Sequence, residues 1–159
     1  MLKVKIINIG KFKEDYLRKA YDEYAKRLSG YCSLEEVVLE PERLPDKPSN
    51  AQIEKALEEE GKKILKKIPA DAFTVAMCIE GKKLDSVAFA KILQEQTLAA
   101  GKICLIIGGS YGLSNEVKKS ANFRLSMSDM TFPHQLAKIM LLEQLYRAFK
   151  INEGGTYHK

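Results

Sequence analysis

Two almost wholly apolar runs constrain the fold of this chain more than any other feature. They are "AFTVAMCI" at residues 72–79 and "KICLIIGG" at 102–109, and the helix-like segment "SVAFAKILQEQTLAA" lies between them. A strand that is apolar along its whole length is buried on both faces, as in parallel sheets, and parallel neighbours need a crossover to connect them. The sequence therefore predicts a parallel sheet with helices on both of its faces.

Strand-like and helix-like patterns alternate along the rest of the chain. Further strands are predicted at 3–10, 34–40 and 122–127, and further helices at 14–28, 51–68 and 133–151. The fold class is therefore α/β, in three layers, with a mainly parallel sheet of about five strands. A length of 159 residues suits one domain, so a single domain over residues 1–159 is expected.

Local patterns predict details of the first two helices. Either Ser49 or Asn50 is expected to cap the helix at 51–68, because both follow a proline-rich loop. The face predicted to be buried in the helix at 14–28 is formed by Tyr16, Ala20, Tyr24 and Leu28, which are spaced four apart.

The composition excludes several classes of protein. The longest apolar runs fall far short of a membrane span, so a soluble protein without a membrane partner is expected. The first segment, "MLKVKIINIG", alternates lysines with apolar residues like a strand and lacks the apolar centre of a secretory signal, which predicts a cytoplasmic location. Cys32, Cys78 and Cys104 form no C-x-x-C pair, so they are expected to be buried thiols and no metal is expected.

The charge is unevenly distributed along the chain. The net charge is +5, with basic segments at 1–31 and 61–159 on either side of an acidic segment at 32–60. This distribution suits a phosphate-rich partner, and a solvated lysine-rich surface explains it equally well.

The last predicted helix carries more apolar side chains than one buried stripe needs. They are Leu136, Ile139, Met140, Leu141, Leu142, Leu145, Tyr146, Ala148, Phe149 and Ile151. Such a helix needs two neighbours, of which its own sheet is one. The same helix of a second subunit is expected to be the other, which predicts a homodimer, and the alternative is a helix buried wholly within one domain.

Three loops are candidates for a ligand site, because ligands of open α/β sheets bind beyond the carboxyl ends of the strands. They are "EGKKLDS" after Ile79, "GGSYGLS" after Ile107 and "SMSDMTFPH" after Leu125. We expect the three loops to meet at one place.

Two of these loops have features of ligand loops. Gly108 and Gly109 permit a tight turn, and Ser114 is expected to cap a following helix, although the glycine spacing matches no dinucleotide or phosphate fingerprint. A strand-to-helix turn without a ligand explains this loop equally well. The loop "SMSDMTFPH" offers free backbone groups that can read an adenine ring, and the alternative is a capped helix start with no ligand.

Two titratable residues of the last helix are further candidates. His134 is expected in the first turn, where the helix dipole lowers the pKa of a histidine. It is then a neutral hydrogen-bonding group or a solvated surface histidine. Arg147 is a lone cation in an apolar helix, and it either pairs with Glu143 or reaches a phosphate.

Seven segments carry a resemblance to a known family. They are "KVKIINIGKFKEDY", "EYAKRL", "IEGK", "IIGGSYGL", "LSMSDMTFPHQ", "EQLYRAFKI" and the closing "YHK". In these segments, which span the whole length, the sequence resembles the ribosomal RNA large subunit methyltransferase H family of the SPOUT superfamily.

The resemblance implies a fold and a cofactor. The fold is a single SPOUT methyltransferase domain, a homodimer with a deep C-terminal trefoil knot, although the pattern alone predicts an unknotted doubly wound sheet. The cofactor is S-adenosyl-L-methionine, held in the knot. The cofactor-binding residues carried over from the family are Met77, Gly108, Gly109, Met127, Ser128, Asp129, Met130, Thr131 and Phe132.

The resemblance also implies a reaction, methylation at N3 of a pseudouridine of 23S ribosomal RNA, position 1915 in reference numbering, on the assembled 70S ribosome. The N3 proton must leave, and a nearby cation or hydrogen-bond donor would stabilise the anionic base. The alternatives are a ribosome-bound dimer that binds the cofactor without transferring methyl groups, and a regulatory nucleotide-binding domain.

The chain closes on "GGTYHK", where Gly154 and Gly155 permit a turn after the last helix. Once the resemblance is taken into account, Tyr157, His158 and Lys159 are expected to close over the cofactor of the same subunit or of its partner. The alternative is a frayed chain end. The predicted catalytic residues are His158, Tyr157, His134 and Arg147.

Overall fold

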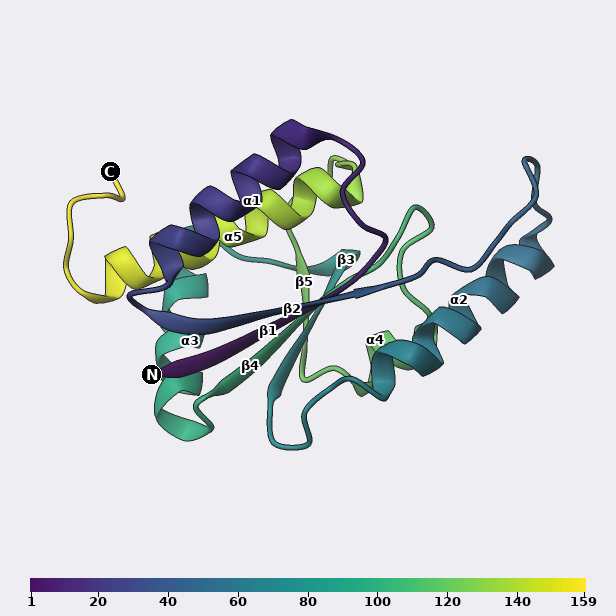
Figure 1. Ribbon diagram of the computed structural model, residues 1–159. Helices are drawn as coiled ribbons and strands as arrows, with labels where there is room; N and C mark the ends of the chain where they lie inside the picture. Colours follow the sequence, from purple (N-terminus) through teal and green to yellow (C-terminus); the bar gives the residue numbers. More distant parts are fainter.

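The computed structural model describes residues 1–159, and it carries all its strands in one sheet (Figure 1). The elements are β1 (Leu2–Ile9), α1 (Asp15–Leu28), β2 (Cys32–Leu39), α2 (Asn50–Leu65), β3 (Phe73–Lys83), α3 (Ser86–Ala99), β4 (Lys102–Ile107), α4 (Asn115–Ser120), β5 (Phe123–Ser126) and α5 (His134–Asn152). The strand order is β2-β1-β4-β3-β5, and every neighbouring pair is parallel. The predicted α/β class with a parallel sheet is confirmed.

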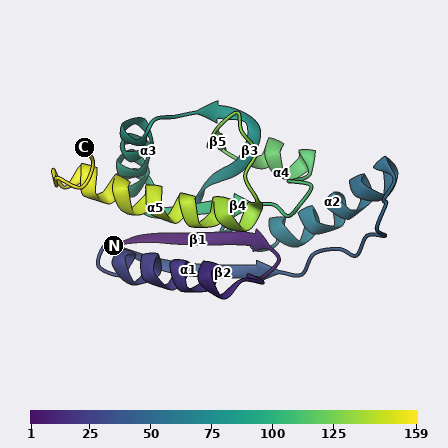
Figure 2. The ribbon, with the colours of Figure 1, turned by 90° about the horizontal axis from the view of Figure 1, so that it is seen from above.

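Helices cover both faces of the sheet. α1, α3 and α5 lie on one face and enclose the larger hydrophobic core, whereas α2 and α4 cover the other face (Figures 1 and 2). The interior strand β1 supplies both cores, because Val4 and Ile6 belong to the first core and Ile7 and Ile9 to the second. Burial on both faces explains why the sequences of the strands are largely apolar. The predicted three layers are confirmed.

α1 buries a different face from the predicted one. Leu17 and Tyr21 are buried, whereas Tyr16 is 68% exposed. A strict spacing of four drifts away from the 3.6-residue turn of an α-helix, so Tyr16, three steps from Leu28, falls outside the buried stripe. The prediction was wrong for Tyr16, whereas Ala20 and Tyr24 are partly buried and pack against the larger core, and Leu28 is fully buried.

The predicted helix caps are present. The Oγ of Ser49 accepts from the backbone N–H of Gln52 at 3.2 Å, and the Gln52 side chain accepts from the Ser49 N–H at 2.8 Å, so Ser49 rather than Asn50 caps α2. Ser114 caps α4 by accepting from the Val117 N–H at 3.3 Å. Each cap satisfies backbone donors that the first turn of a helix leaves free.

β3 continues further than the sequence predicts. The residues "EGKK" at 80–83, expected in a loop, extend the strand, because Lys82 and Lys83 pair with the edge strand β5. Strands β3 and β5 approach each other closely here, since a Cβ on Gly81 would lie 2.8 Å from the backbone of Arg124.

α5 lies between α1 and α3 on the sheet (Figure 2). Its buried residues are Lys138, Ile139, Leu141, Leu142, Leu145 and Ala148. Neighbours within one protomer therefore cover most of its apolar surface, while Leu136 stays 39% exposed. The homodimer expected from this helix stays a prediction.

Candidate active site

A cavity of about 860 Å³ opens beside residues 77–80 of β3 and at the carboxyl ends of β4 and β5. Its walls come from segments 77–80, 107–113 and 125–134, and Lys118 of α4 and Ala137 of α5 complete them. The second and third predicted loops meet here as expected, whereas the first contributes only Glu80, because its residues 80–83 belong to β3. The volume lies within the usual range of small-molecule sites.

All but one of the predicted cofactor residues line this cavity. They are Met77, Gly108, Gly109, Met127, Ser128, Met130, Thr131 and Phe132. Asp129 does not line it. Its side chain is 81% exposed and its carboxylate pairs with the Nζ of Lys83 at 2.6 Å, at the outer side of the same loop.

The glycine turn after β4 is as tight as the sequence predicts. Gly112 has a φ of +84° and donates its N–H to the carbonyl of Gly109 at 3.1 Å. A Cβ on Gly108 would lie 2.2 Å from the Gly112 carbonyl oxygen. Gly108 therefore permits the turn to fold back on itself, which leaves backbone atoms in the cavity wall.

The loop at 127–132 leaves its backbone available to a ligand. None of the backbone hydrogen bonds outside the helices and strands involves these residues. Two serine hydroxyls shape the loop, since Ser126 donates to the Ser128 carbonyl at 3.1 Å and the Ser128 Oγ accepts from the Met130 N–H at 3.0 Å. The remaining N–H and C=O groups are free donors and acceptors at the cavity.

His134 is the predicted catalytic residue that lines the cavity. Burial lowers the pKa of His134, and the charges of Lys13 and Lys138 lower it further. The predicted direction is confirmed, but the causes are burial and two lysines rather than the helix dipole alone. The ring is therefore neutral at neutral pH and can accept a proton.

Three cavity residues were not singled out from the sequence. Cys78 was expected to be buried, yet it is only partly buried and lines the cavity, and burial raises the pKa of its thiol. Cys32 and Cys104 are buried as predicted.

Glu80 and Lys118 form an ion pair in the cavity wall, which lowers the pKa of Glu80. The available signal was the place of Cys78 and Glu80 at the end of the apolar run 72–79, and nothing in the sequence marks Lys118.

Arg147, Tyr157 and His158 form a second group, at the far end of α5. The Nη2 of Arg147 donates to Glu143 at 2.9 Å, as one sequence alternative predicts, and its guanidinium lies 4.7 Å from the ring centre of Tyr157. Tyr157 donates its hydroxyl to Glu143 at 3.0 Å. Nη1 of Arg147 lies 3.2 Å from the Nδ1 of His158, which accepts because a guanidinium only donates.

The structure does not bring the two groups together within one protomer. His134 is the first residue of α5, and Arg147 lies thirteen residues further along the same helix, which at 1.5 Å per residue separates them by about 20 Å. Tyr157 and His158 fold back onto the last turns of α5 and do not line the cavity.

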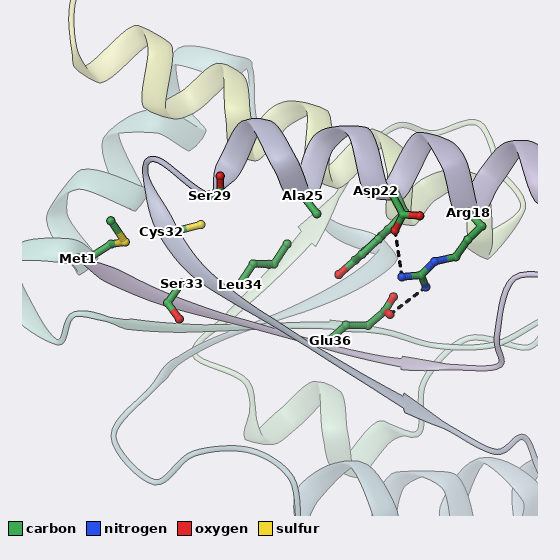
Figure 3. A pocket seen from close by; sticks show the side chains of 10 residues that line it. Met1, Arg18, Asp22, Ala25, Ser29, Cys32, Ser33, Leu34 and Glu36 are labelled. Carbon is green, nitrogen blue, oxygen red and sulfur yellow. Dashed lines mark hydrogen bonds and ion pairs between the residues drawn. The ribbon is translucent and has the colours of Figure 1, made fainter.

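A second hollow, of about 520 Å³, lies between α1 and the edge strand β2 (Figure 3). Arg18 crosses it and pairs with Asp22 and Glu36, each at 3.1 Å. None of the predicted site residues lines this hollow. The cavity at the carboxyl ends of β4 and β5 is therefore the candidate active site.

None of the helices combines the length and the apolar character needed to cross a bilayer. No group of three or more His, Cys, Asp or Glu side chains is arranged to hold a metal ion.

Known proteins are similar to this chain along almost its whole length. The family described as "Predicted SPOUT methyltransferase" matches residues 2–158. Proteins named ribosomal RNA large subunit methyltransferase H are similar over 99% of this chain and 100% of their own length: 46% identical in Clostridioides difficile strain 630, 45% in Carboxydothermus hydrogenoformans and 48% in Bacillus cytotoxicus. The chain therefore belongs to the SPOUT methyltransferase family.

Proposed function

We propose that this protein transfers a methyl group from S-adenosyl-L-methionine to N3 of pseudouridine 1915 in 23S ribosomal RNA, on the assembled 70S ribosome. The observation that carries the proposal is the cavity that residues 77–80 and two strand-end loops form around free backbone groups. The relatives named for methylation of large-subunit ribosomal RNA support the substrate class.

The residues of the cavity suit an adenosyl cofactor. The turn at 108–112 brings backbone close to the ligand space, and a side chain at Gly108 would fill the turn. Half-buried Met77 and Met127 offer polarisable contacts to an aromatic ring or a sulfonium. When bound, S-adenosyl-L-methionine supplies the methyl group as an electrophile.

The residues of the chain then have to accept the N3 proton of the base and stabilise the negative charge that its loss leaves on the base. The N3–H of the base must be lost before N3 can attack the methyl carbon, and neutral His134 in the cavity wall is suited to accept that proton. Arg147 and the N–H of His158 are suited to stabilise the anionic base. Tyr157 is a donor rather than a base, because burial and its bond to Glu143 raise the pKa of its phenol.

We propose further that the site is completed across a homodimer. If the α5 helices of two subunits pack antiparallel, the last turn of one lies beside the first turn of the other. Arg147, Tyr157 and His158 of one subunit would then reach the cavity of its partner. Exposed Tyr16 and Leu136, in the first turns of neighbouring α1 and α5, supply apolar surface for such a contact (Figure 1).

The trefoil knot and the single SPOUT domain over 1–159 belong to the same proposal. Leu125 of β5 pairs with Met77 and again with Lys82, on either side of an irregular bend of β3. This arrangement supports a chain that passes through the bend before α5 begins. An experimental structure that traces residues 77–152 without a break would show the threading or exclude it. A cytoplasmic location follows from a ribosomal substrate.

The proposed reaction is tested by transfer of labelled methyl groups from S-adenosyl-L-methionine to ribosomes that lack the modification, beside free ribosomal RNA. We expect label on the assembled ribosomes only, at N3 of one pseudouridine. Gly108→Ala should lower transfer at least about tenfold, because the new Cβ collides with the Gly112 carbonyl and displaces the cavity wall.

Gly30→Ala is the matched control, since a Cβ at Gly30 meets no atom within 4 Å. It should transfer like the wild type. Tight binding of the cofactor without label on ribosomes or RNA would overturn the enzyme and favour a dimer that only binds the cofactor.

A further inference from the structure

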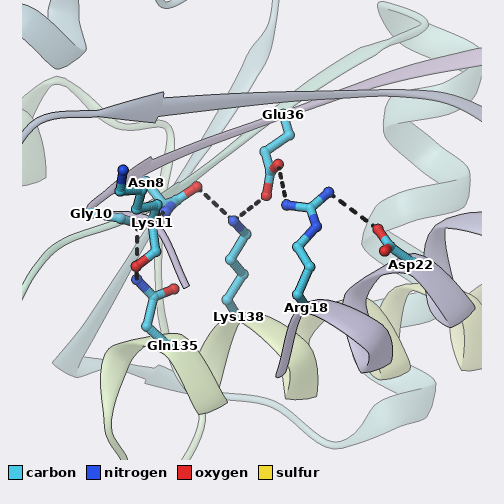
Figure 4. Close-up of polar contacts among 8 residues, drawn as sticks. All are labelled: Asn8, Gly10, Lys11, Arg18, Asp22, Glu36, Gln135 and Lys138. Carbon is cyan, nitrogen blue, oxygen red and sulfur yellow. Dashed lines mark hydrogen bonds and ion pairs between the residues drawn. The ribbon is translucent and has the colours of Figure 1, made fainter. Parts of the chain in front are cut away.

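The loop at 10–14, between β1 and α1, is held against the first turn of α5, beside the cavity. The Nε2 of Gln135 donates to the carbonyl of Gly10 at 2.8 Å and to that of Lys11 at 3.2 Å (Figure 4). Gly10 has a φ of +83°, and its N–H donates to the Leu39 carbonyl at 2.8 Å. Hydrogen bonds therefore restrain the backbone of the loop at Gly10 and Lys11.

A buried ion pair between Lys138 and Glu36 supports the same loop through Asn8. The Nζ of Lys138, on a residue that is 1% exposed, donates to Asn8 Oδ1 at 2.8 Å and pairs with Glu36 (Figure 4). Because a cation occupies its oxygen, the amide of Asn8 turns its nitrogen the other way and donates to the Gly10 carbonyl at 2.8 Å. Gly10 thus accepts from two side chains, and its position is set before any partner binds.

Two unpaired lysines project from this rigid loop. Phe12 between them is half-buried, with its ring centre 4.5 Å from the Nζ of Lys138. Lys11 and Lys13 on either side are exposed, and neither has a carboxylate within the 4.0 Å of an ion pair, unlike Lys83 and Lys118 on the other side of the cavity.

The lysines stand close to the cavity. The Nε2 of His134, a cavity residue, lies 3.9 Å from the position that a Cβ on Gly10 would take. Lys13 is near enough for its charge to act on the pKa of His134. A polymer that feeds one of its units into the cavity on the side of His134 passes this loop.

We propose that Lys11 and Lys13 bind backbone phosphates of the RNA strand that delivers the target base into the cavity. The proposal rests on the proposed function and adds the contact that positions its substrate. A base cannot enter the cavity without its flanking phosphates following it to the mouth, and lysines bind phosphate as compact point charges. A loop that is already ordered loses little entropy when it binds.

The test measures binding of the full-length protein to ribosomes over a series of salt concentrations, with no methyl donor present. The double variant Lys11→Ala/Lys13→Ala should bind about tenfold more weakly at low salt, with the slope of log affinity against log salt reduced by about 1 to 2. The control is Lys66→Ala/Lys67→Ala, which removes two exposed lysines at the end of α2, on the other face of the sheet from α5 (Figure 2).

Calorimetry with S-adenosylhomocysteine should show equal affinity in both double variants and the wild type, which verifies folded cavities. Equal losses of ribosome binding in the two double variants would overturn the proposal, because the attraction would then depend on net charge alone. Unchanged binding and slope in the Lys11/Lys13 variant would overturn it as well. Since no methyl transfer is measured, the result does not depend on whether the proposed reaction occurs.

Discussion

The environment of His134 is set by residues from separate parts of the chain. Its own helix contributes Lys138, and the loop after β1 contributes Lys13, which only the fold brings near. Burial together with these two charges keeps the imidazole neutral in a cavity where the proposed reaction needs a proton acceptor.

We therefore expect the pKa of His134 to lie below the ordinary value of 6.5. Because the folded chain releases this proton more readily than the unfolded chain, stability should fall as the pH drops below 6.5 toward the folded-state pKa, and His134→Gln should remove that dependence. Imidazole NMR measures the pKa directly, since the chain has only two histidines.

Lys13→Ala should raise the pKa of His134, and Lys66→Ala, at the distant end of α2, should leave it unchanged. A pKa of His134 at or above 6.5 in the wild type would contradict the neutral histidine. Equal shifts in the two lysine variants would contradict the specific effect of Lys13.

Some single residues could be predicted from the sequence and others could not. Gly108 was predictable, because a double glycine after a buried strand has few uses other than a tight turn. Cys78 and Asp129 were misjudged, because neighbours in the sequence do not reveal which side of a loop a residue faces. Nothing in the sequence distinguishes Lys11 from other exposed lysines, because the hydrogen bond that holds its loop comes from Gln135, 124 residues away.

At the scale of elements, apolar patterning predicted all five strands and four of the five helices, because a parallel sheet buries both faces of its strands. The short α4 was expected only from Ser114 as a helix cap. The true end of β3 could not be predicted. Polar residues 80–83 continue the strand only because β5, forty residues later, pairs with them. Long-range pairing of this kind leaves no mark on local sequence.

The contact between β3 and β5 gives a prediction for Gly81. A Cβ there would lie 2.8 Å from the carbonyl carbon and oxygen of Arg124, and backbone atoms cannot swing aside as side chains do. Gly81→Ala should therefore lower the free energy of unfolding by about 2–3 kcal/mol, measured by urea denaturation at one protein concentration.

Gly30→Ala serves as the control for Gly81→Ala as well, because open space surrounds Gly30. We expect its free energy of unfolding to stay within about 0.5 kcal/mol of the wild type. If the two variants unfolded at the same urea concentration, the close approach of β3 to β5 would not restrict side chains as described.

At the scale of the whole molecule, α5 separates the two halves of the proposed site. The cavity with His134 lies at its first turn, and the group of Arg147, Tyr157 and His158 lies at its last turns. Sequence alone placed both groups in one site through the family resemblance. The predicted helix at 133–151 already separates His134 from Arg147 by about 20 Å. The sequence could not show that Tyr157 and His158 fold back onto the last turns of that helix.

A mixed dimer tests most directly whether two subunits build one site. One subunit carries Gly108→Ala, which disables its cavity, and the other lacks residues 157–159, which removes its tail. The two chains are co-expressed with different affinity tags, and dimers carrying both tags are purified and assayed for methyl transfer to ribosomes.

Each variant alone should be nearly inactive. In the mixed dimer the intact tail of the first subunit meets the intact cavity of the second, so one site of two is complete and about half of the wild-type activity should return. A mixed dimer as inactive as its parents would contradict a shared site and show that each tail serves the cavity of its own subunit.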